Sequence, residues 1–133
     1  MTIKEIFEKY KTIAVYGMST NASKPSHHVP VFFIKEGYNV IPVNPVASEI
    51  AGNKAYKFLI DIPEEIDILN VFRPSDDCLE VVQEAVARKK AKGDIKLIWL
   101  QEGIENDSAR KLAEENGIEF IEDKCMYKEF VNM

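Results

Sequence analysis

A polar loop that begins at Gly17 and ends at Ser26 holds the residues of this sequence best suited to bind a phosphate group. It follows a β-branched and aromatic run at 12–16, and a helix is expected to begin near Ser26. Gly17 lets a phosphate approach the backbone, Ser19 and Ser26 offer hydroxyl donors, and Lys24 adds a positive charge. The layout predicts a nucleotide-phosphate site at the end of the first strand of a doubly wound sheet.

The loop departs from the dinucleotide fingerprint Gly-x-Gly-x-x-Gly, because Ser19 and Ala22 stand where glycines are required. After the next expected strand, a nicotinamide enzyme places an acid that binds the ribose hydroxyls, whereas this chain has Asn44-Pro45. An amide followed by proline makes an uncharged wall suited to packing against adenine. Both departures favour another adenine-bearing ligand over a nicotinamide cofactor, and an NAD(P)-binding module or oxidoreductase is the alternative.

Polar groups also follow the other expected strands. Arg73 has a planar fork that can bind phosphate or stack on adenine, or pair with a surface carboxylate. Cys125 follows the last strand, as a ligand contact or as a small buried residue. A thioester-processing enzyme that uses Cys125 or His27 is a further alternative, although histidines in a first helical turn more often make hydrogen bonds or face solvent. Cys78 and Trp99 are expected in the core.

Strands and helices alternate along the chain, which predicts an α/β fold: a Rossmann-like, doubly wound, mainly parallel sheet of five to six strands with helices on both faces. The strand order expected is 3-2-1-4-5-6. Ser26, Ser75 and Asn106 are expected to cap helices, and Gly37, Gly93 and Gly117 to end them. The expected helices are 3–10, 26–36, 75–92 and 107–116, and the expected strands are 12–16, 39–43, 55–58, 67–72, 96–100 and 118–121, followed by a short tail.

The composition fits a single domain, residues 1–133, with 46% hydrophobic residues. The net charge of −5 argues against a nucleic-acid partner, and the basic residues Arg88, Lys89, Lys90 and Lys92 are expected at a helix end, where the dipole favours cations. No apolar run is long enough to span a membrane, and the N-terminus does not resemble a signal peptide. Two cysteines make no disulfide framework and no metal-site spacing is present, so we expect a cytoplasmic protein without a metal.

As a set, six segments resemble the CoA-binding domain family, whose related domain opens the alpha subunit of succinyl-CoA synthetase. They are Val15–Ser19, Lys24–Ser26, Val40–Pro45, Asp67–Arg73, Trp99–Ile104 and Asp123–Cys125, in order across most of the chain. The resemblance implies a Rossmann-type fold and bound coenzyme A. It implies phosphate contacts from Gly17, Met18, Ser19, Lys24 and Ser26, adenosine contacts near Asn44, Pro45, Phe72 and Arg73, and contacts to the pantetheine end from Gln101 to Gly103 and from Cys125.

The catalytic part of succinyl-CoA synthetase, a domain with a phosphorylated histidine and a nucleotide-binding partner subunit, has no counterpart in these residues. The resemblance therefore implies the ligand and not the reaction. We expect a protein that binds coenzyme A or an acyl-CoA as a carrier, sensor or regulatory module, and that is a binding protein without a complete catalytic set. A structural domain with a vestigial pocket is the last alternative, and a protein partner or a homo-oligomer is left open.

Overall fold

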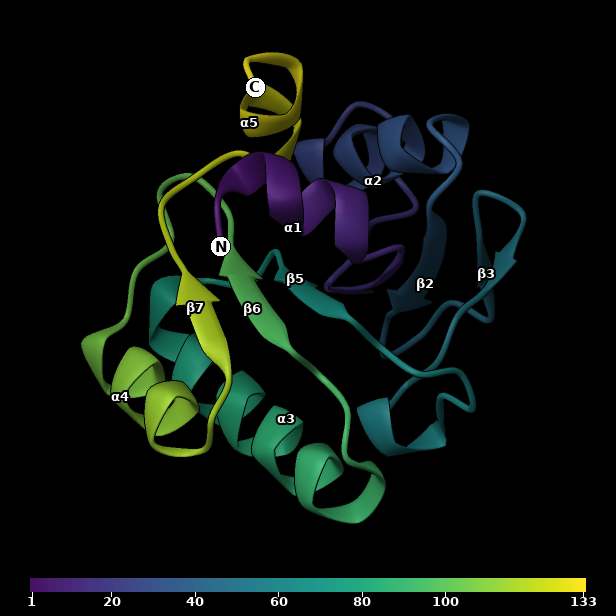
Figure 1. Cartoon of the computed structure of the whole chain (residues 1–133). Coiled ribbons are helices and arrows are strands. Elements are labelled where there is room, and N and C mark those ends of the chain that lie inside the picture. The colour runs from purple at the N-terminus through teal and green to yellow at the C-terminus, as the bar shows by residue number, and fades with distance from the viewer.

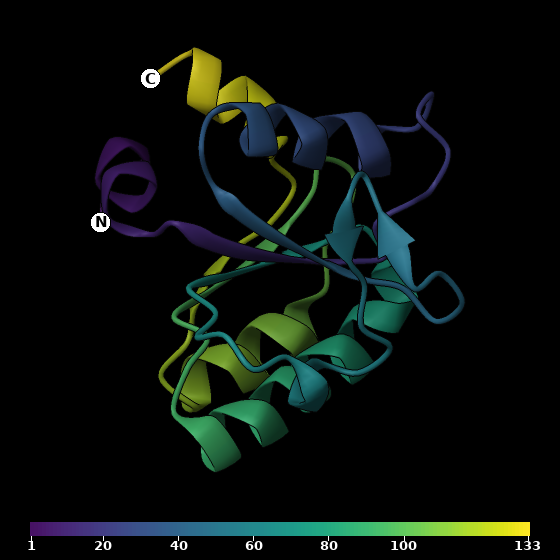
Figure 2. The ribbon, with the colours of Figure 1, turned by 90° about the vertical axis from the view of Figure 1, so that its right-hand side faces the viewer.

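The computed structural model describes residues 1–133 as two helical layers around one parallel sheet (Figures 1 and 2). The helices are α1 (Ile3–Lys9), α2 (Pro25–Lys35), α3 (Cys78–Lys92), α4 (Asp107–Glu115) and α5 (Met126–Val131). The strands are β1 (Thr12–Tyr16), β2 (Asn39–Val43), β3 (Glu49–Ile50), β4 (Asn53–Lys54), β5 (Ile68–Val71), β6 (Leu97–Leu100) and β7 (Glu119–Ile121). Short 3₁₀ turns lie at Leu59–Asp61 and Ser75–Asp77.

The main sheet has five strands in the order β2-β1-β5-β6-β7, all parallel. Its central strands β5 and β6 are buried throughout, as expected for a sheet covered on both faces. The predicted fold class and the predicted order of the shared strands are confirmed. The order reverses beside β1, so the carboxyl ends of β1 and β5 flank the switch point where ligands of such sheets bind.

Each face of the sheet has its own hydrophobic core. On one face α1, α2 and α5 bury Phe7, Phe33 and Met126 against β1 and β6, where Trp99 is fully buried. On the other face α3 and α4 bury side chains such as Val82 and Ala109 against the same strands. Cys78 lies in this second core, as predicted. None of the helices combines the length and apolar character needed to cross a lipid bilayer.

The prediction of a strand at 55–58 is wrong. Residues 49–54 instead form an antiparallel hairpin, β3 with β4, outside the main sheet. Ala51 and Gly52 both have positive φ angles (52° and 80°), the backbone that a two-residue hairpin turn requires. Tyr56 makes only an isolated bridge to Val43, and Phe58 is 52% exposed. The backbone of this segment therefore pairs with the free edge of β2 at Tyr56 alone, and no sixth strand forms there.

Three smaller boundary predictions also change. Helix α2 begins at Pro25 with Lys24 as its N-cap, not at Ser26, because the fixed φ of proline suits the first helical position. Ser75 does not cap α3; its Oγ accepts from Glu105 N–H at 3.1 Å, and a 3₁₀ turn precedes the helix. The predicted short tail contains α5. The Asn106 cap and the glycine stop at Gly93, with a φ of 82°, are confirmed.

Candidate functional site

Gly17 stands where the loop after β1 meets the loop after β5. Its φ is +88°, a conformation that favours glycine. A Cβ built there would lie 2.6 Å from the carbonyl oxygen of Phe72. The two strand ends therefore approach more closely than any side chain at position 17 allows, and this approach of the Phe72 backbone is a reason for glycine apart from the predicted approach of a phosphate.

The loop from Gly17 to Ser26 is fastened to the first turn of α2. Ser19 N–H donates to the carbonyl of Ser26 at 3.1 Å. That carbonyl lacks its usual helical donor because residue 30 is proline, which has no N–H. His27 Nδ1 lies 2.7 Å from the carbonyl oxygen of Ser19, and since a carbonyl only accepts, Nδ1 carries the proton. The Pro30 position thus helps to fix the loop.

Several hydrogen-bond donors of this loop have no acceptor within the protein. They are the backbone N–H groups of Met18, Thr20, Ala22 and Ser26. Lys24 is exposed and its side chain makes no capping bond to the 11-residue helix α2 that follows it. Helix N-termini carry a partial positive charge, so unpaired N–H groups beside a free lysine form a surface suited to an anion.

Asn44 ties the β2 loop to the β1 loop. Its Nδ2 donates to the carbonyl of Met18 at 2.9 Å, and its Oδ1 accepts from the N–H groups of Val46 and Ala47, each at 2.8 Å. The Met18 side chain is fully buried, so this residue offers a ligand only its backbone. Pro45 is exposed, next to the hydrogen-bonded side chain of Asn44.

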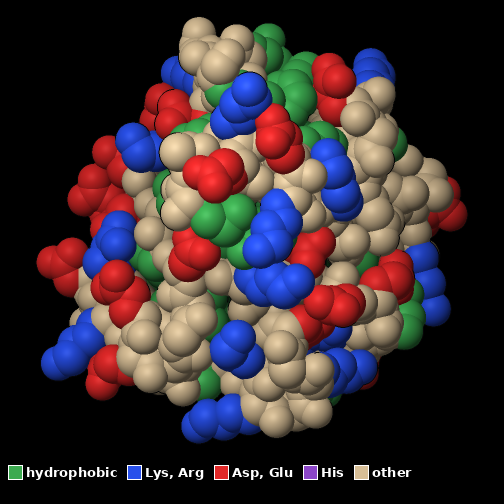
Figure 3. Space-filling model, in the orientation of Figure 1, with side chains coloured by type: hydrophobic (Ala, Val, Ile, Leu, Met, Phe, Trp, Pro, Cys, Tyr) green, Lys and Arg blue, Asp and Glu red, His purple; other side chains and the backbone are tan.

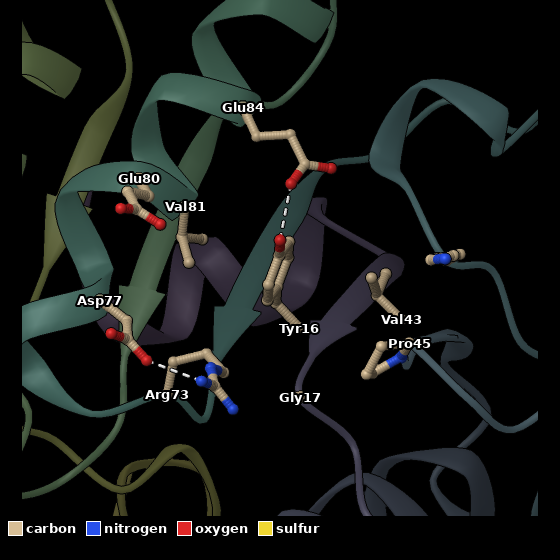
Figure 4. Close-up of a pocket in the computed structure, with 10 residues that line it drawn as sticks. Tyr16, Gly17, Val43, Pro45, Arg73, Asp77, Glu80, Val81 and Glu84 are labelled. Atoms are coloured by element: carbon tan, nitrogen blue, oxygen red, sulfur yellow. Dashed lines mark hydrogen bonds and ion pairs between the residues drawn. The ribbon is translucent and has the colours of Figure 1, made fainter.

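A first cavity, of about 470 Å³, opens between the ends of β1 and β2 and the helix α3 (Figure 4). Arg73 reaches into it and pairs with Asp77 at 2.6 Å between Nη2 and Oδ2, which is the surface-carboxylate alternative considered for this arginine. Its lining consists of strand-end residues and one face of α3: Tyr16, Gly17, Val43, Pro45, Lys57, Arg73, Asp77, Glu80, Val81 and Glu84.

The helical wall of the first cavity is acidic. Glu84 accepts from the Tyr16 hydroxyl at 2.6 Å and, through its other oxygen, from Leu59 N–H at 2.8 Å. Burial of Tyr16 and its bond to Glu84 raise the pKa of the phenol well above its ordinary value. The lining of this cavity contains three carboxylates, at Asp77, Glu80 and Glu84, and two cations, at Lys57 and Arg73. It therefore suits a neutral group with hydrogen-bonding capacity better than a phosphate.

A second cavity, of about 680 Å³, is lined from the opposite layer, by α2, α5 and the loop after β6. The rings of Phe32 and Tyr127 meet edge to face in its wall, with centroids 4.8 Å apart. Lys128 Nζ pairs with Glu102 Oε1 at 3.0 Å at its rim. Its lining is Pro25, His28, Val29, Phe32, Gln101, Glu102, Cys125, Tyr127 and Lys128.

Gln101, in the wall of the second cavity, is 5% exposed. Its Oε1 accepts from Met126 N–H at 3.3 Å, whereas its Nε2 is buried without any hydrogen-bond partner. Gly103, two residues further on, is exposed, and its N–H donates to Asp123 Oδ1 at 2.7 Å. The loop after β6 thus holds one buried donor that the protein leaves unpaired.

The structure divides the predicted site residues into three places along the carboxyl edge of the sheet. The anion surface has Gly17, Met18, Ser19, Lys24 and Ser26; the β2 and β5 ends have Asn44, Pro45, Phe72 and Arg73; the far end has Gln101, Gly103 and Cys125. Of these, Pro45, Gly17 and Arg73 line the first cavity, and Gln101 and Cys125 line the second.

Sequence reasoning missed the acidic wall on α3 and the contribution of α5. Glu80 and Glu84 are one helical turn apart, which places both on one face, but nothing in the sequence marks that face as the one toward β1. For α5, the spacing of Met126 and Phe130 was an available signal, because residues four apart share a helical face.

Comparisons with known proteins agree with the sequence resemblance. A model of the CoA binding domain matches residues 11–130. An uncharacterized protein of Bacillus subtilis, YneT, is 38% identical over 124 residues, covering 93% of this chain and 88% of that protein. The solved structure of Thermus thermophilus ID.343 has a TM-score of 0.90 at 35% identity, with 99% of this chain and 98% of the other covered.

A longer relative shares only this region. The ADP-forming acetate–CoA ligase II of Archaeoglobus fulgidus is 33% identical over 87 residues, which are 64% of this chain and 13% of the ligase. The matched residues thus make up a small part of that ligase and most of this chain. The family match over nearly the full length, on the fold that the structure shows, is sufficient for assignment: the chain belongs to the CoA-binding domain family.

Proposed function

We propose that this chain binds coenzyme A or an acyl-CoA along the carboxyl edge of its sheet. One observation carries the proposal: a loop of unpaired N–H groups and a free lysine at the N-terminus of α2. The phosphates are assigned to Gly17, Met18, Ser19, Lys24 and Ser26, with Met18 acting through its backbone. Charge-assisted bonds of this kind are stronger than neutral ones, so the phosphates anchor the ligand.

The adenosine is assigned to the first cavity. Its acidic wall disfavours phosphate but accepts hydrogen bonds from a base or ribose. Asn44 Nδ2 donates to the Met18 carbonyl and Phe72 N–H to the Tyr16 carbonyl, so both hold the strand ends together. Pro45 offers an uncharged surface to the ring. Because Arg73 is paired with Asp77, its guanidinium plane is held in place for stacking on adenine.

The pantetheine arm is assigned to the far end of the edge, past Gln101 and Gly103 toward Cys125. The family match and the name of the acetate–CoA ligase relative support a CoA ligand. We carry over the ligand and not the ligase reaction, since the shared region is 13% of that enzyme. We further propose that the chain uses this binding as a carrier, a sensor or a regulatory module.

The test is ligand selectivity, measured as a shift of the melting temperature. A ligand that binds only the native state at ~100 times its Kd stabilises it by about 2.7 kcal/mol, a shift that a domain of this size shows clearly. We expect the shift with CoA and none with NAD or NADP. Mass spectrometry of the purified protein, native and then denatured, identifies any co-purified ligand. A larger shift with NAD or NADP than with CoA would refute the proposal.

A further inference from the structure

The second cavity is larger and more apolar than a terminal thiol requires. Val29 is 4% exposed, and the Phe32 ring packs edge to face against Tyr127, Phe33 and Phe130, with centroids 4.8, 5.2 and 5.5 Å apart. These contacts hold the rings in place, so the apolar wall is formed before any ligand arrives. The volume of about 680 Å³ exceeds what a sulfhydryl group fills.

The unpaired donor of Gln101 adds a specific requirement. Met126 N–H can bond only to the amide oxygen, and this fixes Nε2 as the end without a partner. Burying a donor without an acceptor is costly, and a ligand that brings an acceptor recovers that cost. A free thiol is a poor acceptor. The carbonyl of a thioester is a good one, and it lies next to the sulfur at the end of the pantetheine arm.

We propose that the second cavity holds the acyl group of an acyl-CoA, with Gln101 Nε2 donating to the thioester carbonyl. The proposal rests on the proposed function and assigns its substrate class: short, uncharged acyl thioesters in preference to free CoA. An acyl group that ends in a carboxylate is disfavoured, because the rim cation Lys128 is already paired with Glu102 at 3.0 Å.

Calorimetric titration of the full chain with matched ligands separates the two contacts. Isobutyryl-CoA should bind more tightly than CoA, by about fourfold for each methylene buried. Propionyl-CoA should bind about three to ten times more tightly than the thioether S-propyl-CoA, which matches its chain but lacks the carbonyl. Succinyl-CoA should gain less than isobutyryl-CoA.

Variants assign the effect to the cavity, with the ratio of acyl-CoA to CoA affinity as the readout. Gln101→Glu keeps an acceptor for Met126 N–H and removes the donor, so the advantage of propionyl-CoA over S-propyl-CoA should disappear. Tyr127→Ala, at a side chain that is 40% exposed, should reduce the preference for isobutyryl-CoA without unfolding the protein. Phe58→Ala is the control, since Phe58 is 52% exposed and lines neither cavity.

Failure of this proposal is distinct from failure of the proposed function. If CoA binds and the acyl-CoAs bind no more tightly, the acyl assignment is wrong and CoA binding stands. The same holds if propionyl-CoA and S-propyl-CoA bind equally, or if succinyl-CoA is preferred. If neither CoA nor any acyl-CoA binds, both proposals are overturned.

Discussion

At the amino-terminal edge of the sheet, the buried polar side chains Arg88 and Asp94 are fully paired. Arg88, 1% exposed, bonds to both carboxylate oxygens of Asp94 and donates to the backbone carbonyls of Leu59, Ile62 and Glu64. Asp94 in turn accepts from the backbone N–H of Ile66, two residues before β5. A buried ion pair is tolerated only when such bonds satisfy its remaining groups, and here they do.

The carboxyl-terminal edge of the same sheet leaves polar groups unpaired. Gln101 is also buried, with 5% of its surface exposed, yet its Nε2 has no partner. Four N–H groups of the β1 loop, those of Met18, Thr20, Ala22 and Ser26, have none either. In Figure 3 basic and acidic side chains are interspersed over the visible face, with no extended patch of one sign. Local pairing therefore distinguishes the two edges: the polar side chains buried at the amino-terminal edge are paired, whereas the carboxyl-terminal edge keeps free donors, where we propose that the ligand binds.

Removal of Arg88 should have the largest effect on stability. Arg88→Met leaves the Asp94 carboxylate buried without its cation and removes the bonds of the arginine to three backbone carbonyls, so we expect a loss of about 3–5 kcal/mol in the free energy of unfolding, measured with urea. Lys90→Met, on the exposed side of α3, is the matched control and should change stability by less than about 0.5 kcal/mol. Equal losses in both variants would contradict the contrast between the edges.

The loss in Arg88→Met should depend on pH. Burial of Asp94 favours its neutral form, but hydrogen bonds from Arg88 and Ile66 N–H outweigh burial and lower its pKa. A carboxyl whose folded pKa is depressed stabilises the fold above its unfolded value, about 3.9, and this stabilisation is lost as pH falls through the folded pKa. The difference between wild type and Arg88→Met should therefore be full near neutral pH and shrink in acid. A difference that is constant with pH would exclude the ion pair as its source.

At the carboxyl-terminal edge, two glycines with similar backbones should respond differently. Gly17→Ala forces a Cβ to within 2.6 Å of the Phe72 carbonyl oxygen, so we expect a loss of about 2–4 kcal/mol in stability and weaker CoA binding. Gly103 has a similar φ, +84°, but open space around it, so Gly103→Ala should cost only about 1–2 kcal/mol. Urea unfolding measures both. Equal costs would show that the loops after β1 and β5 can separate.

Lys24→Ala should weaken binding without weakening the fold. Lys24 is exposed and gives α2 no side-chain cap, so stability should stay within about 0.5 kcal/mol of wild type. CoA affinity should fall by about 1.5–3 kcal/mol, the range for a hydrogen bond to a charged group. Lys35→Ala, in the last turn of α2, is the control by calorimetry. If both variants bind CoA as wild type does, the phosphates lie elsewhere.

The parts of the fold that were predictable are those fixed by local chemistry. β6 is a continuous apolar run and β5 is apolar except for Asn70, Asn106 is a good cap, and Gly93 supplies a left-handed stop. The prediction of a strand at 55–58 failed because the choice between extended pairing with β2 and a single bridge, made here by Tyr56, depends on tertiary contacts. The segment's own composition does not decide that choice.

The positions of the candidate site residues at the strand ends were predictable, but the cavities that they line were not. Arg88 shows the limit: its place near the end of α3 matched the expected basic cluster, yet it is buried against Asp94 and not solvated. The spacing of residues along the sequence shows which of them share a helical face. It does not show which residues of other elements that face contacts. For the same reason the acidic wall of the first cavity and the unpaired Nε2 of Gln101 could be found only in the structure.

The smallest expected effect on stability is that of Cys125→Ser, and this variant tests how far the pantetheine arm reaches. Burial raises the pKa of the Cys78 thiol to about 11, so this cysteine should not react. Cys125 lines the second cavity and is a free, partly exposed thiol. With CoA disulfide as oxidant, the Cys125 thiolate would attack one sulfur, form a protein–CoA disulfide and release one CoA thiolate.

Intact-protein mass after incubation with CoA disulfide measures this reaction. We expect one CoA adduct in the wild type and in Cys78→Ala, and none in Cys125→Ser, with little change in stability in the last. Glutathione disulfide is the control: it lacks the nucleotide, so it should modify Cys125 more slowly than CoA disulfide if the phosphate loop delivers the thiol. An adduct that persists in Cys125→Ser, or equal rates of modification with both disulfides, would show that the thiol end of the pantetheine arm does not bind in the second cavity. In that case the phosphate site at the carboxyl edge could still stand, but it would not direct the thiol of CoA to Cys125.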